Sequence, residues 1–164
     1  YISPLIRARQ TAEILLAGRD IPVLESEGIK ELGFGAYEGM CCSGENRDTE
    51  SEKFKSFFTD TGNYVPAEGG ESIQALMERT GKFLRELCGD AALSGKQILV
   101  STHGAAMTAL LNQIRGNFEI ADFWKWQVPA NFAVTIVEAK GGVPAIVEEN
   151  IIYYKEPVKK WSME

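Results

Sequence analysis

A single histidine at a strand-to-helix junction is the residue best placed to do chemistry in this sequence. His103 is the only histidine among 164 residues, and it lies between the apolar run Gln97–Ser101 and a stretch of helical spacing that begins at Gly104. In open α/β sheets, ligands sit at the carboxyl ends of strands, where helices begin. Free N–H groups at such a helix start favour an anion. A lone histidine can equally be structural or exposed, so residue type alone leaves its role open.

The elements that position His103 follow from the periodicity of the apolar residues. Helical spacing predicts helices over Arg7–Leu16, Glu52–Phe58, Glu71–Leu87 and Gly104–Leu111 with a stop at Gly116, and a short helical segment within Phe118–Trp126. Extended segments are expected at Tyr1–Ser3, Ile21–Leu24, Gln97–Ser101, Phe132–Glu138 and Val143–Tyr154. The run Gln97–Ser101 is expected to be a buried strand, and the Gly-Gly turn before Val143 suits a hairpin.

Two stretches are expected to be irregular. Gly28–Gly39 combines four glycines with two aromatic residues, which indicates a shaped loop, and it contains Glu31 and Glu38. Taken alone, a glutamate in a loop is usually solvent-exposed. The polar tail Lys155–Glu164 is expected to fray.

Composition limits the class of protein. The length predicts one domain over residues 1–164, and 45% hydrophobic with 24% charged residues is typical of a globular chain. A formal net charge of −6 argues against a nucleic-acid-binding surface. It still allows a small anionic substrate, because a few convergent basic groups can set a local field of the opposite sign.

The cysteines indicate neither a disulfide framework nor a metal site. Three cysteines, two of them adjacent at Cys41 and Cys42, together with one histidine make a poor zinc ligand set. We therefore expect reduced thiols in a cytoplasmic protein. No apolar stretch approaches the roughly 18 residues of a membrane helix, so no membrane association is expected.

Three separated stretches resemble the motifs of one protein family. Ser3–Ala12 reads S-P-L-I-R-A-R-Q-T-A, Ile29–Gly39 reads I-K-E-L-G-F-G-A-Y-E-G, and Val100–Gly104 reads V-S-T-H-G. They are similar, in the same order, to motifs of the histidine phosphatase superfamily in its phosphoglycerate mutase-like branch. Gly69–Ser72 and Asn131 also fit positions of that family. The resemblance implies an α/β fold, a three-layer α/β/α sandwich with a mostly parallel central sheet, here lacking its first βα unit.

The resemblance also implies roles for particular residues. Arg7 matches the arginine that clamps the phosphate, and a guanidinium offers a planar fork of donors to phosphoryl oxygens. Glu31 matches the proton donor to the leaving group. His103 matches the histidine that stabilises charge on the phosphoryl oxygens, with the Gly104 amide as a further donor, whereas Glu38 is expected to shape the loop. The implied reaction uses no metal and no cofactor, and its substrate is a small phosphorylated metabolite.

One residue that the resemblance implies does not occur. The family's chemistry depends on a transiently phosphorylated histidine in an R-H-G motif upstream of S-P-L, but this sequence contains no R-H-G and no second histidine. The chain is interpreted either as an N-terminally truncated piece of an ordinary enzyme or as a natural short form that binds phosphate-bearing ligands or a partner without turnover. As given, it is predicted to be inactive alone.

Among activities, a phosphomonoester hydrolase is favoured. The interval between Glu31 and His103 is short, whereas the mutases that this family resemblance implies carry a longer insertion there. Phosphoglycerate mutase activity and a non-catalytic phosphate-binding or regulatory module stay open as alternatives. An unrelated nucleotide-binding domain is disfavoured because neither G-x-x-x-x-G-K-[ST] nor G-x-G-x-x-G occurs. The sequence does not specify an oligomeric state.

Overall fold

The structure is a computed structural model, and it describes residues 1–42, 45 and 48–155. The expectation that the tail frays falls on residues 156–164, which lie outside the described residues. The helices are α1 (Ile6–Leu16), α2 (Ser51–Thr59), α3 (Ile73–Gly89) and α4 (Gly104–Arg115). The strands are β1 (Val134–Lys140) and β2 (Val143–Ile151). Short 3-10 helices lie at η1 (Glu27–Ile29), η2 (Gly35–Tyr37), η3 (Thr61–Asn63), η4 (Ala91–Leu93) and η5 (Ile120–Asp122).

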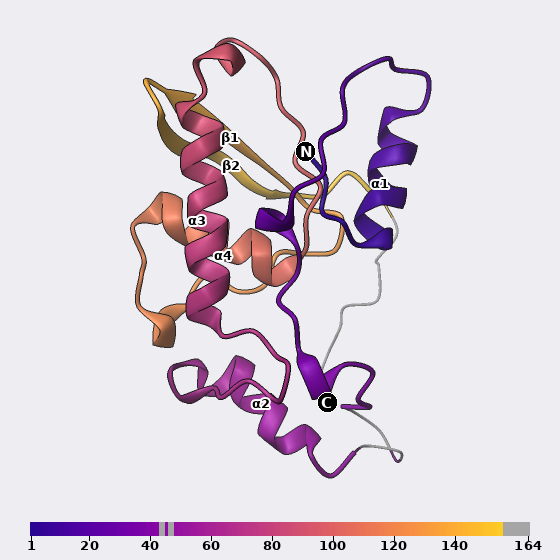
Figure 1. Cartoon of the computed structure of the whole chain (residues 1–164), viewed down its shortest axis with the longest axis vertical. Helices are drawn as coiled ribbons and strands as arrows, with labels where there is room; N and C mark the ends of the chain where they lie inside the picture. Colours follow the sequence, from indigo (N-terminus) through magenta and orange to yellow (C-terminus); the bar gives the residue numbers. More distant parts are fainter. Residues whose placement is uncertain (43–44, 46–47, 156–164) are drawn as a thin grey trace.

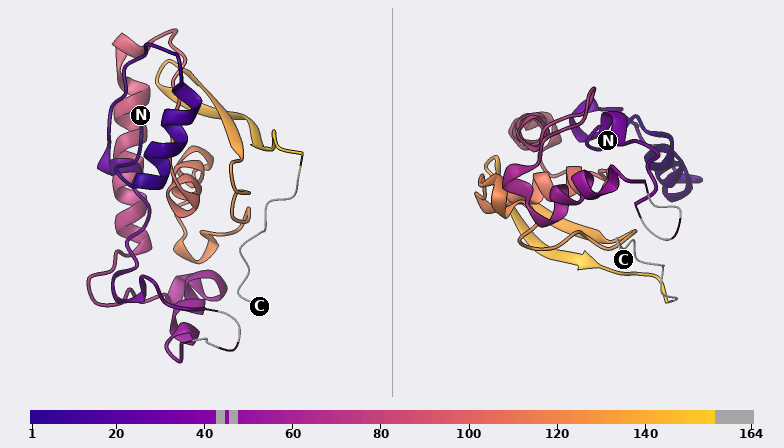
Figure 2. Two further views of the ribbon diagram at one scale, coloured as in Figure 1. Left: turned by 90° about the vertical axis from the view of Figure 1, so that its right-hand side faces the viewer. Right: turned by 90° about the horizontal axis from the view of Figure 1, so that it is seen from below.

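Helix α4 occupies the middle of the fold. It packs against α3 on one side and against β2 on the other, and both views in Figure 2 show α3 and the hairpin on opposite sides of α4. Helix α1 stands apart from α3, with the extended N-terminal segments between them (Figure 1). The first residue of α4 therefore lies next to these extended segments.

Three extended segments run parallel beside the start of α4. Ile2 forms parallel bridges to Glu25 on one side and to Ser101 on the other. The pairing uses Ile2 N–H to Leu24 C=O at 2.9 Å and Ser101 N–H to Tyr1 C=O at 2.9 Å. This fixes the register of the segment near residues 21–24, which the sequence left open. Ser3 and Ser101 are consequently buried side by side.

The expected α/β class is found, but a mostly parallel central sheet is not confirmed. Within the described residues the sheet is the antiparallel β1–β2 hairpin, and parallel pairing is confined to the two isolated bridges. The expectation of a buried strand at Gln97–Ser101 is wrong for most of its length, because Ile98 and Leu99 are 39% and 44% exposed. The backbone hydrogen bonds between this segment and other strands go to Tyr1–Ser3, so its pairing in the described chain is on one side.

The hairpin forms where it was predicted, with Lys140 opposite Val143. Gly141 and Gly142 both have positive φ, at 57° and 80°. Two consecutive left-handed residues match the twist of a two-residue hairpin turn, and glycine adopts them without a steric penalty. An extended segment was expected at Phe132–Glu138, and β1 begins two residues into it, exposed along most of its length.

Helix α3 begins two residues later than predicted, because Ser72 caps it. The Ser72 hydroxyl accepts a hydrogen bond from the Ala75 amide at 3.1 Å, which satisfies one free amide of the first turn. The predicted apolar stripe is buried over most of its length, at Ile73, Leu76, Met77 and Phe83. This stripe packs on the buried alanines of α4 to form the core.

A second packing unit surrounds Phe57 of α2. We call Phe34, Phe54, Phe57, Phe58 and Trp124 the Phe57 cluster, in which neighbouring ring centroids lie 4.7–6.0 Å apart. Phe57 is 1% exposed. Trp124 contributes from a segment where a short helix was expected; the structure has only the single 3-10 turn η5 there, and Phe118 is 62% exposed.

Candidate active site

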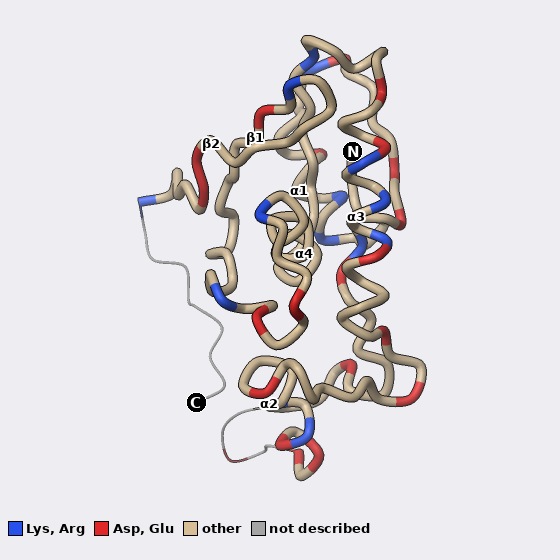
Figure 3. Tube along the Cα trace, turned by 90° about the vertical axis from the view of Figure 1, so that its left-hand side faces the viewer, with Lys and Arg blue, Asp and Glu red and all other residues tan. Residues whose placement is uncertain are grey.

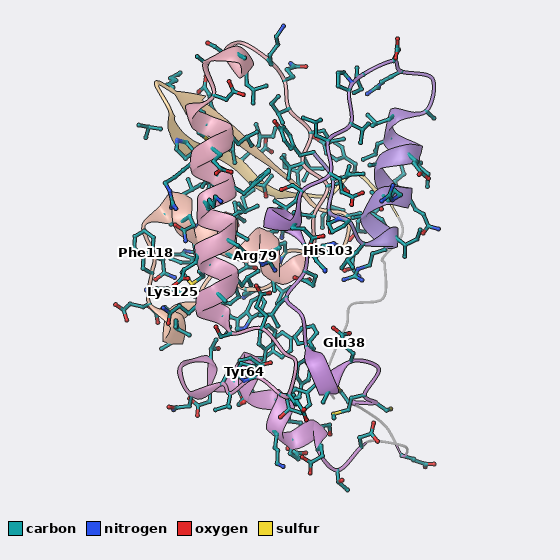
Figure 4. All side chains as sticks on the ribbon, in the orientation of Figure 1. Glu38, Tyr64, Arg79, His103, Phe118 and Lys125 are labelled. Atoms are coloured by element: carbon teal, nitrogen blue, oxygen red, sulfur yellow. The ribbon has the colours of Figure 1, made fainter. Side chains whose placement is uncertain are left out.

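Two hydrogen bonds, one on each side of the His103 side chain along the backbone, fix His103 at the start of α4. The Thr102 hydroxyl donates to the Ile29 carbonyl at 2.8 Å, and the His103 carbonyl accepts from Met107 as the first bond of the helix. His103 itself is extended, with φ −132° and ψ 174°. The imidazole therefore projects from the junction instead of following the helix. Figure 4 shows His103 at this junction and Arg79 on α3 at the same level of the molecule.

Both ring nitrogens of His103 have partners. Nδ1 lies 3.1 Å from Nε of Arg7, and Nε2 lies 2.7 Å from the hydroxyl oxygen of Ser3. A guanidinium only donates, so Nδ1 must accept and carries no proton. The proton of the neutral ring is then on Nε2, which donates to Ser3.

The surroundings of His103 disfavour its charged form. Burial, as the largest cause, and the positive charges of Arg7 and Arg79 together lower the pKa of His103 to about 4. At neutral pH the ring is uncharged. This agrees with the hydrogen bonds, which require one protonated and one unprotonated ring nitrogen.

The distance between Ser3 and His103 is that of a nucleophile and its general base. The tautomer excludes that role, because the ring nitrogen that faces Ser3 already carries the proton. The hydroxyl is also fully buried. Ser3 therefore serves the ring as an acceptor, and a serine hydrolase is disfavoured.

The carboxylate of Glu31 lies over the first turn of α4. It accepts from the Ala106 amide at 3.0 Å, the Ala105 amide at 3.3 Å and its own neighbour Leu32 at 3.1 Å. The sequence led us to expect an anion at this helix start, and the anion found there is the protein's own side chain. In the described part of the chain no group accepts from the Gly104 amide, so this donor is left for a ligand.

Glu31 is held between opposing influences. Burial raises its pKa above the ordinary value of a glutamate, whereas the amides of Leu32, Ala106 and Ala105 and the charge of Arg7 lower it. Burial is the largest of these effects. The direction is the one that a proton donor needs, because a raised pKa keeps more of the acid protonated.

Arg79 was not singled out from the sequence, yet it fixes the loop that carries Glu31. Its guanidinium forms a two-pronged ion pair with Glu71, at 2.6 and 2.8 Å. The same group donates to the carbonyls of Glu27, Gly28 and Glu31, each at 3.2 Å. Such contacts join positions about 50 residues apart, so no local pattern could have indicated them.

Glu38 helps to shape the rest of the loop, as the sequence led us to expect. Its carboxylate accepts from the Phe34 amide at 3.1 Å, and Figure 4 places Glu38 well away from His103. Gly35 is needed at its position, since its φ is +58° and an added Cβ would lie 2.3 Å from the Gly70 nitrogen. This close approach ties the loop to the turn that precedes α3.

In the structure Arg7 contacts His103 directly. Gly104 follows His103 as the first residue of α4, and the Glu31 carboxylate lies over the same helix start. We call Ser3, Arg7, Glu31, Arg79 and His103 the His103 cluster. Figure 3 shows basic and acidic positions interspersed along the trace. A surface hollow of about 360 Å³ lies elsewhere, between η3 and η5, but Asp60 and Asp122 line it and Lys125 is paired with Asp122 at 3.0 Å. It is poorly suited to a phosphate.

A family model for the histidine phosphatase superfamily (branch 1) matches residues 1–152. The chain belongs to this superfamily. Among curated relatives, an adenosylcobalamin/alpha-ribazole phosphatase of Salmonella typhimurium is 30% identical, over 77% of this chain and 60% of the relative. An uncharacterised phosphatase, PhoE, of Bacillus subtilis is 32% identical over 70% of this chain and 51% of its own length. A 2,3-bisphosphoglycerate-dependent phosphoglycerate mutase of Parvibaculum lavamentivorans is 28% identical over 70% and 55%.

Solved structures give the same assignment. Bacillus stearothermophilus YhfR matches with a TM-score of 0.80 and 25% identity, covering 92% of this chain and 72% of that one. A phosphoserine phosphatase mutant from Entamoeba histolytica, in complex with phosphoserine, matches with a TM-score of 0.68 and 27% identity, over 90% and 71%. The chain spans about half to three fifths of the length of the curated relatives named above. The relatives of this chain therefore include both phosphatases and phosphoglycerate mutases.

Among the described residues, no three histidine, cysteine, aspartate or glutamate side chains gather as a metal site would require. No helix in the described part of the chain has the length and apolar character needed to cross a membrane. Cys41, Cys42 and Cys88, all within the described residues, form no disulfide with one another.

Proposed function

We propose that this chain provides the phosphate-binding and acid side of a phosphomonoester hydrolase that acts on a small phosphorylated metabolite. The observation that carries the proposal is the pairing of Arg7 Nε with His103 Nδ1 at 3.1 Å. This pairing lies beside the Gly104 amide, which donates to no group in the described part of the chain. It supports a site where a guanidinium, an imidazole and a helix start converge on one anion. We place it in one cytoplasmic domain.

Charge supports the same assignment. Arg79 forms a salt bridge with Glu71. Arg7 is exposed, contacts the neutral ring, and its charge acts on Glu31 without a salt bridge to any described residue. Arg7 is then the cation that attracts a phosphoryl group despite the net charge of −6. A guanidinium can bind two phosphoryl oxygens at once through parallel N–H donors.

The reaction is proposed to proceed in two steps. A histidine outside these 164 residues attacks phosphorus, the ester bond breaks, and the leaving alcohol takes its proton from Glu31. Water then attacks the phosphohistidine and releases inorganic phosphate. Arg7 and His103 stabilise the charge on the phosphoryl oxygens throughout.

His103 is a poor candidate for the nucleophile. Its unprotonated nitrogen is engaged by Arg7 and its protonated nitrogen by Ser3. Attack by His103 would also remove the ring from the oxygens it is proposed to stabilise. The 164-residue chain is accordingly expected to bind phosphate without turning over a phosphoester.

The relatives support a small substrate and metal-independent chemistry. One curated relative from Arabidopsis thaliana is named as a metal-independent phosphoserine phosphatase, at 29% identity over 70% of this chain. The names of two other relatives above refer to alpha-ribazole and to phosphoglycerate. Phosphate release from phosphoserine and isomerisation of phosphoglycerate, assayed on the natural gene product, would separate hydrolase from mutase.

The binding proposal is tested on the 164-residue chain by titration calorimetry with inorganic phosphate. Replacing Arg7 by Ala is expected to lower the affinity at least tenfold with no change in the unfolding curve. Arg19→Ala is the matched control, because Arg19 is also exposed but lies after α1 and away from His103. Equal affinity of the Arg7→Ala variant and the parent would remove the case for this site. Turnover of phosphoserine by the chain alone would instead remove the need for an outside histidine.

A further inference from the structure

The partner of His103 Nε2 is a residue to which the proposed function gives no role. Ser3 is 0% exposed, and its hydroxyl oxygen lies 2.7 Å from Nε2. Its amide donates to the Ser101 carbonyl at 2.9 Å, so its backbone is fixed in the parallel pairing. The Leu5 amide approaches the same hydroxyl oxygen at 3.4 Å. Ser3 is therefore a rigid acceptor aimed at one nitrogen of the ring.

The direction of the Ser3–His103 hydrogen bond follows from the other side of the ring. Arg7 Nε can only donate, so Nδ1 is unprotonated. If Ser3 also donated to Nε2, the ring would carry no proton at all, which is not accessible at ordinary pH. Ser3 must accept, and it selects the tautomer with the proton on Nε2.

This arrangement leaves His103 without a spare N–H for an anion. Nε2–H is given to Ser3, and Nδ1 has only a lone pair, to which an unprotonated phosphoryl oxygen cannot hydrogen-bond. To contact a phosphoryl oxygen while Ser3 keeps its bond, the ring must gain a proton at Nδ1. Arg7 must then turn its Nε away from the ring.

The charges that face the ring make such a gain dependent on the anion. Arg7 reaches it from α1, Arg79 lies toward it from α3, and both disfavour the imidazolium. Glu31, from the loop, lies over the following turn of α4 with its carboxylate on the Ala105 and Ala106 amides. A bound phosphate would offset the two arginines and so favour a positive ring.

We propose that Ser3 is a positioning residue that holds His103 in the Nε2–H tautomer, so that binding of a phosphate at Arg7 is accompanied by proton uptake at Nδ1 of His103. The proton comes from solvent, no covalent bond changes, and the phosphoryl oxygen accepts the new Nδ1–H. The inference rests on the proposed phosphate site and adds the atom of the ring through which that site acts.

The single histidine allows a direct test on the 164-residue chain without a histidine tag. With ¹⁵N-labelled histidine, long-range proton–nitrogen spectra give one pair of ring signals, which report the protonation of Nδ1 and Nε2 separately. At pH 7 without ligand, we expect Nε2 protonated and Nδ1 unprotonated. Saturating inorganic phosphate should raise the pKa of His103 from about 4 by roughly 1 to 3. In a pH titration with phosphate, Nδ1 should therefore become protonated between about pH 5 and about pH 7, where the ring of the ligand-free chain is still neutral.

The role of Ser3 is tested with Ser3→Ala, which removes the acceptor and is expected to give a mixture of the two neutral tautomers. Phosphate affinity should fall by about threefold to tenfold. Ser101→Ala is the matched control, because Ser101 is a neighbouring buried serine whose hydroxyl bonds the Ala8 carbonyl instead of the ring. It should leave the tautomer unchanged. The ligand-free spectrum of the parent chain needs no variant, so the inference stays testable if Ser3→Ala does not fold.

Each outcome points to a different conclusion. Protonated Nδ1 in the ligand-free chain at pH 7, or an unchanged tautomer in folded Ser3→Ala, would overturn the role of Ser3. Phosphate binding that depends on Arg7 but leaves both ring signals unmoved would overturn the coupled proton uptake and spare the proposed function. Failure of phosphate to bind in calorimetry would overturn the proposed function and the coupling together.

Discussion

The His103 cluster and the Phe57 cluster meet within one loop but are held together by different forces. Glu31 belongs to the first cluster and Phe34 to the second, only three positions further along the chain. Around His103 the contacts are hydrogen bonds between groups with a fixed donor and a fixed acceptor. Around Phe57 they are ring contacts and burial, with centroids 4.7–5.3 Å from Phe57 to its closest partners in the cluster.

This difference determines what each cluster tolerates. Burial of apolar surface is roughly proportional to area and has no direction, so a ring can be exchanged for another of similar volume at modest cost. A hydrogen-bonded cluster instead fails when one donor or acceptor is removed, because its partner is left unsatisfied. We therefore expect substitutions around Phe57 to change stability and substitutions around His103 to change binding and titration.

The largest expected effect is on stability. Phe57→Ala removes the central ring of its cluster, which is 1% exposed, and should lower the free energy of unfolding by about 3–5 kcal/mol. Urea denaturation measures this loss. Phe118→Ala is the matched control, since Phe118 is 62% exposed and should change stability by less than about 0.5 kcal/mol. Similar losses for both variants would contradict the central place of Phe57.

The next effect lies where the two clusters share the loop. Arg79→Met leaves Glu71 and the carbonyls of Gly28 and Glu31 without their donor. The pair is about one quarter exposed, so we expect a loss of about 2–3 kcal/mol in the free energy of unfolding, together with weaker phosphate binding.

The control for this variant is Arg9→Met. Arg9 pairs with Glu25, but both side chains are nearly half exposed, and exposed ion pairs contribute less than about 1 kcal/mol. Denaturation curves of the two variants, measured side by side, decide the matter. If Arg9→Met cost as much as Arg79→Met, the loop would not depend on the fork of Arg79.

Through the family resemblance, the sequence predicted residues of the candidate site but not the contacts between them. Arg7, Glu31 and His103 were predicted from short patterns. Ser3 begins the S-P-L motif, but it lies 100 positions from His103, so no local pattern indicates their contact. The segment Gln97–Ser101 shows the opposite failure. Its apolar run is that of a covered strand, but periodicity does not reveal whether neighbours cover both faces, and Leu99 is 44% exposed.

A smaller effect appears in the pH dependence of stability. The pKa of His103 is about 4 in the folded chain and near 6.5 when unfolded, so the unfolded state binds its proton first as the pH falls. The free energy of unfolding should therefore decrease as the pH falls from about 6.5 to about 4. Below about pH 4, His103 should cause no further decrease. One full proton gives about 1.4 kcal/mol per pH unit, and because His103 is only partly buried, it should give less.

His103→Gln removes this dependence and serves as the comparison. Glu31 contributes with the opposite sign, because its pKa is higher in the folded chain than in the unfolded chain. Its contribution to stability is therefore lost as the pH rises from the unfolded-state pKa through the folded-state pKa. Both chains contain Glu31, so the difference between their unfolding free energies isolates His103. A constant difference from pH 4 to pH 7 would show that the ring titrates normally in the folded state.

The smallest effect is expected at the helix start itself. Gly104 does not have a positive φ, and an added Cβ would meet Val128 at 3.6 Å and Glu31 at 3.9 Å, both ordinary contacts. Gly104→Ala keeps the backbone N–H that is proposed to bind phosphate. We expect stability within about 1 kcal/mol of the parent and a change in phosphate affinity below threefold.

Gly89→Ala at the end of α3 is the control for this last variant, because a Cβ there would meet nothing within 4 Å and it lies far along the helix from Arg79. Comparing Gly104→Ala with Gly89→Ala tests the effect of side-chain shape at the helix start while the backbone N–H donor is kept. If the site depends on directed hydrogen bonds, a methyl group at Gly104 changes little, whereas loss of the Arg7 fork abolishes binding. A large loss of affinity in Gly104→Ala, with stability unchanged, would mean that close steric fit at the helix start matters as much as the donors, and that the His103 cluster resembles the Phe57 cluster more than its hydrogen bonds suggest.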